Sequence, residues 1–327
     1  MTDRRRFVVA LAGSVAALSL PVQAQRMEGS PRIGYLDQGP SARNHKYVDA
    51  LLQGLHDLGW KREDIAIEAR FAEGKTDQLP ALAAELVHAK VDVIATWSTP
   101  AALAAKRATA TIPIVIGFTA DPVGSGIVAS LARPGANITG WTHLGLELRA
   151  KYLELLKDAV PDAARFGVLW NPNNQVHKPS LDTIEAAART LHVEVYPAGV
   201  PRASEFEGTY AALLDKGAQA LIVFPDGMFV AQMPTILSLS SRHRLPTMYG
   251  LREYVEAGGL MAYGADLTAM ERRIGASFVD RILKGAKPGD LPVAQPTKFE
   301  LLINVKTARA LGLTLPESLM MRADQVI

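Results

Sequence analysis

Short apolar runs recur along the chain, and each is followed by a polar turn and a segment whose apolar residues have helical spacing. The first series has such runs at residues 32–36, 91–95 and 112–116, and a more alternating run at 65–71. Apolar, β-branched runs of this length are typical of strands buried on both faces of a parallel sheet. The alternation of strands and helices therefore predicts a parallel sheet with right-handed crossovers.

The same rhythm restarts after Trp141. Runs at residues 166–170 and 220–224 predict two further buried strands, and helical patterns lie between and after them. The two series repeat an architecture but not a sequence. A chain of 327 residues with 48% apolar residues is long and apolar enough for two cores. The fold class expected is α/β, with two doubly wound parallel-sheet lobes joined by a hinge.

The stretch from Ile112 to Trp141 predicts how the first lobe ends. After the strand at 112–116 comes a polar turn, and the pattern then predicts a helix over 123–131 with Asp121 as its N-cap. Residues 138–141 are predicted to be an extended crossing into the second lobe. A binding loop that leads directly into a crossing suggests a ligand site near the hinge.

The later chain is expected to cross between the lobes twice more, near residue 266 and after residue 305. Residues 31–141 and roughly 266–305 are then predicted to form lobe 1. Residues 142–265 and roughly 306–327 are predicted to form lobe 2.

The N-terminus has the pattern of a cleavable export signal over residues 1–24. Arg4, Arg5 and Arg6 precede an apolar stretch, and Val22-Gln23-Ala24 supplies a small-x-small cleavage pattern. The apolar stretch is shorter than the ~20 residues that a spanning helix needs. Both a twin-arginine route and the general secretory route fit, and either predicts a periplasmic protein.

Composition excludes several classes of function. The absence of cysteine rules out disulfides, thiolate metal sites and cysteine catalysis. Loss of residues 1–24 balances the charge, so no basic surface indicates nucleic acid. The seven histidines lack metal-ligand spacing, and His143 and His177, near loops expected to face the cleft, are interpreted as surface residues. No hydrolase elbow, P-loop or dinucleotide fingerprint is present, so no cofactor, metal or catalytic residue is predicted.

Candidate binding residues follow strand ends, where open α/β sheets bind ligands. Residues at such positions could equally cap helices, and Trp141 could instead pack the hinge. The residues so identified are Asp37, Gln38, Trp97, Ser98, Thr99, Thr119, Asp121, Trp141, Asn171 and Asp226.

The residue types in these turns indicate the chemistry of the ligand. Helix N-termini at Ser98–Thr99 and at Thr119–Asp121 would hold an anionic group through backbone N–H donors. Asp121 and Asp226 would accept an ammonium group, and Trp97 would stack on an apolar or aromatic body. This combination favours an amino acid or an aromatic or branched carboxylate.

Several stretches together resemble a known family, the ABC-transporter substrate-binding proteins that include the tryptophan-binding TrpX proteins. The stretches are 98–104 (STPAALA), 111–115 (TIPIV), 121–123 (DPV), 130–135 (SLARPG), 137–140 (NITG), 171–172 (NP), 258–264 (GGLMAYG), 282–288 (ILKGAKP) and 308–313 (ARALGL). The resemblance implies a type I periplasmic binding protein fold, a small-molecule ligand between the lobes and delivery to ABC permease subunits in the inner membrane. It places ligand contacts at the turns 98–100 and 121–122 and at Asn171 and Asp226.

The favoured interpretation is therefore a monomeric periplasmic solute receptor without enzymatic activity. Two alternatives stay open. One is an enzyme on the same two-lobed scaffold, because a fold does not settle a function. The other is a ligand-sensing module of a signalling system.

Overall fold

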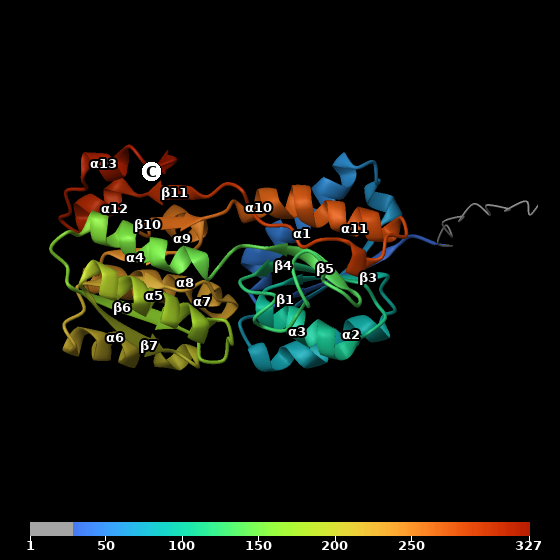
Figure 1. Cartoon of the computed structure of the whole chain (residues 1–327), viewed down its shortest axis with the longest axis horizontal. Coiled ribbons are helices and arrows are strands. Elements are labelled where there is room, and N and C mark those ends of the chain that lie inside the picture. The colour runs from blue at the N-terminus through green and yellow to red at the C-terminus, as the bar shows by residue number, and fades with distance from the viewer. Residues whose placement is uncertain (1–28) are drawn as a thin grey trace, which may run out of the picture.

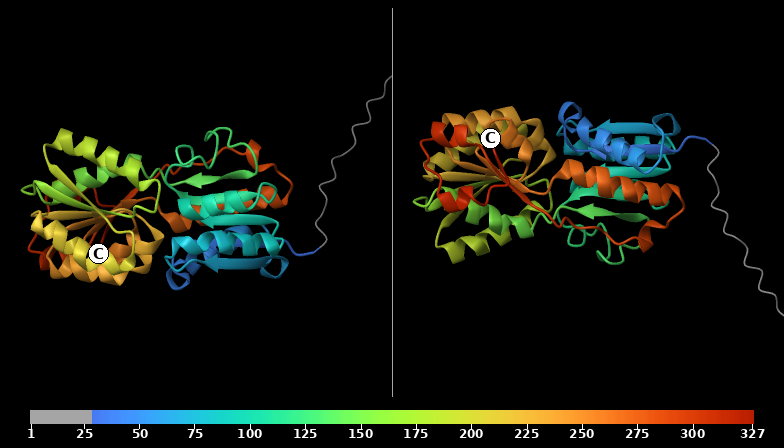
Figure 2. Two further views of the ribbon diagram at one scale, coloured as in Figure 1. Left: turned by 90° about the horizontal axis from the view of Figure 1, so that it is seen from below. Right: turned by 90° about the horizontal axis from the view of Figure 1, so that it is seen from above.

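The computed structural model describes residues 29–327, and these form two α/β lobes that lie side by side (Figure 1). The predicted export signal lies outside the described residues. Two further views show that each lobe is a sheet covered by helices on both faces (Figure 2). Within residues 29–327 no helix combines the length and the apolar character needed to cross a bilayer. The α/β fold class expected from the sequence is confirmed.

The first sheet contains five parallel strands in the order β2-β1-β3-β4-β5. They are β1 (Arg32–Asp37), β2 (Ala66–Phe71), β3 (Val93–Trp97), β4 (Ile114–Thr119) and β5 (Ile138–Thr142). Helices α2 (Leu79–His88) and α3 (Thr99–Ala108) pack together on one side. On the other side lie α1 (Ser41–Asp57), α10 (Leu267–Met270) and α11 (Ala276–Leu283), the last two joined by a π-helical turn at Glu271–Gly275.

The second sheet contains seven strands in the order β12-β11-β10-β9-β8-β6-β7, and β10 and β11 pair antiparallel. The strands are β6 (Arg165–Trp170), β7 (Glu194–Gly199), β8 (Ala220–Val223), β9 (Thr247–Tyr249), β10 (Met261–Gly264), β11 (Glu300–Ile303) and β12 (Gln325–Val326). The helices are α4 (Glu147–Ala159), α5 (His177–Leu191), α6 (Phe206–Asp215), α7 (Gly227–Ala231), α8 (Met233–Arg242), α9 (Arg252–Glu256), α12 (Val305–Ala310) and α13 (Glu317–Met320).

Three segments cross between the lobes, at residues 143–146, 265–266 and 295–299. The third differs from the crossing expected after residue 305. Because β11 pairs with β10, the chain has already returned to the second lobe by Glu300. Residues 138–141, expected to be a crossing, instead belong to β5, an edge strand of the first sheet.

A glycine allows β5 to pack closely against β4. Gly140 has a φ of +137°, and a Cβ atom there would lie 2.1 Å from the carbonyl oxygen of Ile116. Only glycine tolerates both this backbone conformation and this approach.

The helix expected over residues 123–131 is wrong, because this segment forms consecutive turns. The Asp121 carboxylate accepts a hydrogen bond from the N–H of Gly124 at 2.8 Å, and Gly126 has a φ of +69°. A positive φ is incompatible with a right-handed helix. Asp121 therefore closes a local turn and caps no helix.

Candidate functional site

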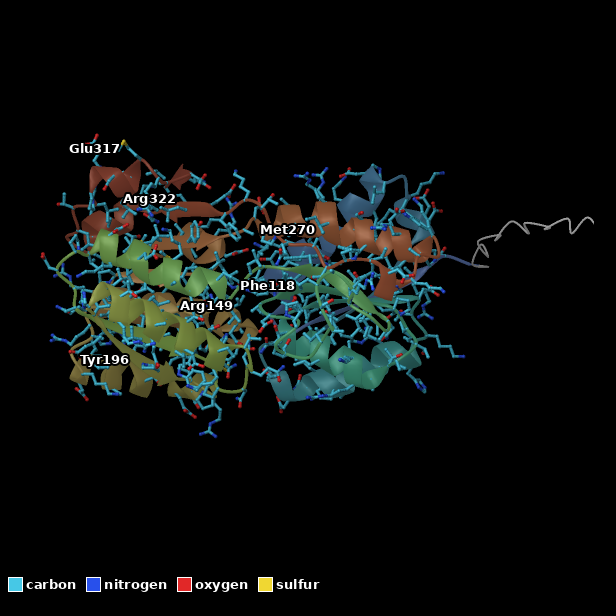
Figure 3. The ribbon with its side chains drawn as sticks, in the orientation of Figure 1. Phe118, Arg149, Tyr196, Met270, Glu317 and Arg322 are labelled. Atoms are coloured by element: carbon cyan, nitrogen blue, oxygen red, sulfur yellow. The ribbon has the colours of Figure 1, made fainter. Side chains whose placement is uncertain are left out.

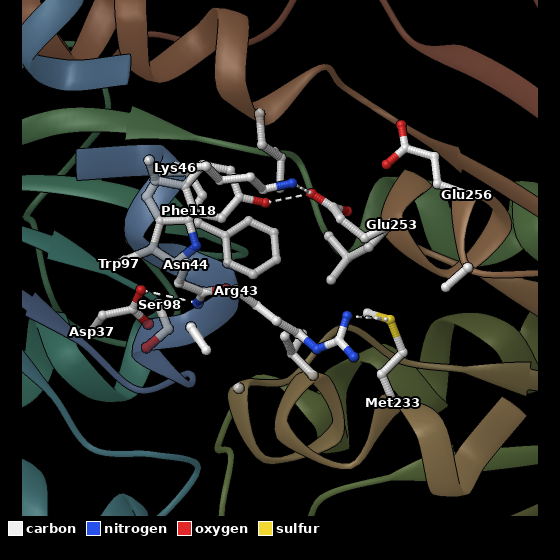
Figure 4. Close-up of a pocket in the computed structure, with 17 residues that line it drawn as sticks. Asp37, Arg43, Asn44, Lys46, Trp97, Ser98, Phe118, Met233, Glu253 and Glu256 are labelled. Atoms are coloured by element: carbon white, nitrogen blue, oxygen red, sulfur yellow. Dashed lines mark hydrogen bonds and ion pairs between the residues drawn. The ribbon is translucent and has the colours of Figure 1, made fainter. Parts of the chain in front are cut away.

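The candidate site is a pocket between the lobes, with a volume of about 400 Å³ (Figure 4). This volume falls within the range typical of small-molecule sites. Lobe 1 contributes strand ends and the first turns of α1, and lobe 2 contributes α7, α9 and the start of α8. The side chains that matter most to the argument are Asp37, Arg43, Lys46, Tyr47, Trp97, Ser98, Phe118, Met233 and Glu253.

A row of aromatic rings runs along the lobe 1 wall. The ring of Trp97 stacks on that of Tyr47, with centroids 3.9 Å apart, and lies 5.6 Å from that of Phe118. Phe118 in turn stacks on His143 at 4.5 Å. The row therefore extends from α1, across the ends of β3 and β4, to the first crossing between the lobes. Such faces suit an aromatic or apolar ligand body.

The backbone is strained at two points of this wall. Ser98 has a φ of 107° and Phe118 a φ of 49°, although neither is glycine. The pairing of β4 with β5 shifts register between Ile116 and Thr119, so a bulge aims Phe118 into the pocket. Backbone strain of this kind gathers at ligand clamps and active sites.

A buried carboxyl group lies at the other end of the wall. Asp37 accepts hydrogen bonds from the N–H of Gly39 at 2.6 Å and from the Asn44 amide at 2.9 Å. Burial raises its pKa to about 7, and the hydrogen bonds from Gly39 and Asn44 offset only part of this effect. The group can therefore both accept from and donate to a ligand near neutral pH.

The facing edge of lobe 2 carries a hydrogen-bonded polar cluster. Asp226 caps α7 through the N–H of Met228 at 2.9 Å. Its carboxylate also accepts from the amides of Asn171 at 3.1 Å and Asn174 at 3.0 Å. The Oδ1 atom of Asn174 is buried and has no partner within residues 29–327. The cluster is thus rich in acceptor oxygens.

The two histidines interpreted as surface residues are buried, so that interpretation is wrong. In His177, Nδ1 accepts the N–H of Asn171 at 2.8 Å, so Nε2 carries the proton and donates to the carbonyl of Pro225 at 3.2 Å. Burial lowers its pKa to about 4, which keeps the ring neutral. His177 therefore fixes the loops that hold Asp226.

Contacts across the cleft hold the lobes together. Glu253 of lobe 2 accepts hydrogen bonds from Lys46 and from the Tyr47 hydroxyl, the latter at 2.7 Å. The Arg43 guanidinium lies 3.5 Å from the sulfur of Met233 (Figure 4). All three lobe 1 residues belong to the start of α1.

Of the residues singled out from the sequence, Asp37, Trp97 and Ser98 line the pocket. The Ser98 hydroxyl caps α3 by accepting the N–H of Ala101 at 3.3 Å. Gln38 lies beside the pocket and packs against Gly227 of lobe 2. Asn171 and Asp226 do not line the pocket themselves, but Asp226 immediately precedes Gly227, which does, and it accepts a hydrogen bond from Asn171.

The other four residues do not line the pocket. Thr99 accepts the N–H of Ala120 at 3.4 Å, and Thr119 donates to the carbonyl of Trp141 at 3.2 Å. Trp141 is fully buried and donates its indole N–H to Glu271 at 3.1 Å. Asp121 is half-buried in its turn.

The expected pair of helix N-termini does not form. A helix begins after Ser98, but none begins after Asp121. An anionic ligand group would therefore need another partner. Across the part of the chain that the structure describes, no three acidic or histidine side chains are grouped to hold a metal ion.

Sequence reasoning missed several side chains of this site, among them Tyr47, Phe118 and Glu253. The apolar spacing of residues 44–58 predicts a helix with Tyr47 on its apolar face, which indicates packing. Phe118 continued an apolar strand, and only its bulge turns it outward. The sequence offers no signal for Glu253, because its partners Lys46 and Tyr47 come from a distant segment.

Two α/β lobes, three crossings and a pocket between the lobes define a two-lobed solute-binding protein. A family model for ABC transporter substrate binding proteins matches residues 39–327. The chain belongs to this family.

Two relatives show the range of similarity. The chain is 30% identical over 283 residues to a tyrosine-binding protein of Clostridioides difficile. The matched region covers 86% of this chain and 80% of the relative. It is 27% identical to an ABC domain from Streptococcus pneumonia solved in complex with L-Trp. That match has a TM-score of 0.85 and covers 91% of this chain and 100% of the other.

A third comparison bears on the arrangement of the lobes. A ligand-free, open substrate-binding protein from Clostridium difficile is 26% identical, with 90% of this chain and 99% of the other covered, but its TM-score is only 0.64. This chain therefore superposes better on the L-Trp complex than on this ligand-free, open structure.

Proposed function

We propose that this protein is the solute receptor of an ABC importer and that it captures an aromatic α-amino acid between its lobes. The observation that carries the proposal is the aromatic row of Tyr47, Trp97 and Phe118 along the pocket wall. The two relatives named for tyrosine and tryptophan support the same class of ligand.

The length of the wall favours a long amino acid. Asp37 pairs with Trp97 on the next strand, and Trp97 pairs with Gly117 on the strand after that. Neighbouring strands lie about 4.8 Å apart, so Asp37 and Phe118 are separated by roughly 10 Å. A tyrosine or tryptophan lying along this wall would place its phenol or indole N–H near Asp37. An aliphatic side chain would offer this buried carboxyl no hydrogen bond beyond those from Gly39 and Asn44.

The ammonium group of the ligand would be accepted by Asp226 and Asn174. Asp226 Oδ2 accepts only the Asn174 amide and keeps acceptor capacity for a further donor, and Asn174 Oδ1 is buried without a partner among the described residues. These acceptors lie beside Gly227, which lines the pocket.

Binding would work by population shift. A ligand that touches both lobes stabilises the closed arrangement, in which Glu253 meets Lys46 and Tyr47. The closed protein then delivers its ligand to permease subunits. The export signal over residues 1–24 would place the mature protein, beginning near Gln25, in the periplasm.

Calorimetry of the purified protein tests the proposal. L-tyrosine and L-tryptophan should bind with one site per chain, L-phenylalanine more weakly, and L-leucine weakest. Trp97→Ala should cost at least ~2 kcal/mol of binding free energy, as buried aromatic anchors do. The matched control is Trp60→Phe, because Trp60 packs in lobe 1 and donates to Asp280 away from the pocket.

Two results would overturn the proposal. One is an absence of binding by all the aromatic amino acids. The other is chemical conversion of a bound amino acid, which would favour the enzyme alternative and would appear as a new species when the ligand is recovered.

A further inference from the structure

A buried arginine without an acidic partner lies at the hinge end of the cleft. Arg149, in the first turn of α4, is 1% exposed. Its Nε and Nη1 atoms have no hydrogen-bond partner within residues 29–327. The guanidinium carbon lies 4.6 Å from the centroid of the Phe224 ring and 5.1 Å from that of Tyr152. Aromatic faces offset only part of the cost of removing a cation from water.

A second unpartnered group stands beside this arginine. His143 lies on the first crossing, is buried, and has no partner for either ring nitrogen among the described residues. Burial and the charge of Arg149 lower its pKa to about 3, so the ring is neutral and offers one N–H donor. Two buried donors without partners among the described residues, one of them a cation, therefore lie on the first crossing and on the helix turn that follows it.

The His143 end of this pair adjoins the pocket. The His143 ring stacks on Phe118, and Phe118 lines the pocket. Figure 3 labels Phe118 and Arg149 where the two lobes meet. Phe118, on its strained backbone, therefore links the pocket to His143.

We propose that Arg149 and His143 form the subsite for the α-carboxylate of the ligand. The inference rests on the proposed function, which it deepens by naming the residues that recognise the acid group. A carboxylate would pair with the guanidinium and accept the His143 N–H, and so satisfy both groups at once. The side chain of Phe118 turns aside to admit it.

The position of the ammonium acceptors agrees with this assignment. Arg149 lies over Phe224, two residues before Asp226 on the same strand end. The ammonium and carboxylate of an α-amino acid share one carbon atom, so their partners must lie close together. Both partners belong to lobe 2, with Arg149 in α4 and Asp226 at the start of α7.

The test compares two ligands and two variants by calorimetry and thermal melting. Wild type should bind L-tyrosine at least about 100-fold more tightly than tyramine, which lacks the carboxylate, because an unpaired buried charge is costly. Arg149→Met should lose this preference and bind L-tyrosine about 100-fold more weakly. Its ligand-free melting temperature should equal or exceed that of wild type, because the variant removes an uncompensated charge. Arg242→Met, which removes an exposed lobe 2 cation that pairs with Glu207 outside the pocket, should leave the affinity for L-tyrosine within about twofold of wild type.

Equal binding of tyrosine and tyramine by wild type would overturn the subsite, and so would an unchanged affinity in Arg149→Met. A lower melting temperature with unchanged affinity would give Arg149 a role in packing alone. If the variant fails to fold, the comparison of the two ligands in wild type decides. An absence of binding by wild type is a separate outcome, since it overturns the proposed function before any variant is made.

Discussion

Replacing Asp37 by asparagine should change how stability depends on pH. Burial raises the pKa of Asp37 from 3.8 to about 7. Between these values the unfolded chain has released the proton that the folded chain retains, so unfolding becomes easier as pH rises. The loss is about 1.4 kcal/mol per pH unit, or about 4 kcal/mol over three units. Burial raises the pKa of Glu271 to about 8, so this carboxyl group also lowers the free energy of unfolding as pH rises.

Two histidines act with the opposite sign. Burial lowers the pKa of His143 to about 3 and that of His177 to about 4. Below 6.5 the unfolded chain binds protons that the folded chain does not, so their contribution to stability rises with pH up to that value. Between pH 5 and 6.5 the slopes that the two acids and the two histidines give to the stability nearly cancel. Above 6.5 only the acids remain, and stability falls towards pH 8.

Urea denaturation of the ligand-free protein from pH 5 to 8 measures these slopes. The free energy of unfolding of wild type should be nearly constant up to pH 6.5 and should then fall. The free energy of unfolding of Asp37→Asn should rise relative to that of wild type by about 1.4 kcal/mol per pH unit up to pH 7. Above pH 7 the difference between the two proteins should stay constant. Any cost of rearranging the Asn44 amide is constant with pH. A difference between the two proteins that does not vary between pH 5 and 7 would refute the reasoning.

Three further predictions concern the fold and export. Gly140→Ala should prevent stable folding, seen as lost expression or a melting temperature at least 10 °C lower, whereas Gly126→Ala, with nothing within 4 Å of its Cβ, should cost only about 1 kcal/mol. Ser98→Ala removes the cap of α3 and should lower the free energy of unfolding by ~1 kcal/mol in urea. Replacing Arg4 and Arg5 by lysine should retain the precursor in the cytoplasm if the twin-arginine route is used, and normal export would identify the general secretory route.

The fold was largely predictable because its signals are local. Each buried strand of a parallel sheet is a short apolar run, and the helices between strands carry their own spacing. The failures involve information that is not local. Whether residues 300–303 join the first or the second sheet depends on pairing with β10, about 40 residues earlier, which periodicity does not reveal. The Gly-Ser-Gly sequence at 124–126 is a local signal for the turns at 121–131. The helix prediction rested instead on Asp121 and Pro122, which are typical of a helix start.

The site was predictable only in part, because strand ends are visible in a sequence and their surroundings are not. Trp97 and Trp141 both end strands, yet one lines the pocket and the other is buried against Glu271, 130 residues away. Arg149 looked like an ordinary helix residue. Its burial depends on Phe224 and Tyr152, which only the folded lobe brings to it.

A crystal structure of the protein with L-tyrosine or L-tryptophan bound tests the central claim most directly. The account predicts the ring against Trp97, the ammonium at Asp226 and the carboxylate within hydrogen-bond distance of Arg149. An amino acid bound outside the pocket between the lobes would contradict the account, and so would one whose carboxylate points away from Arg149.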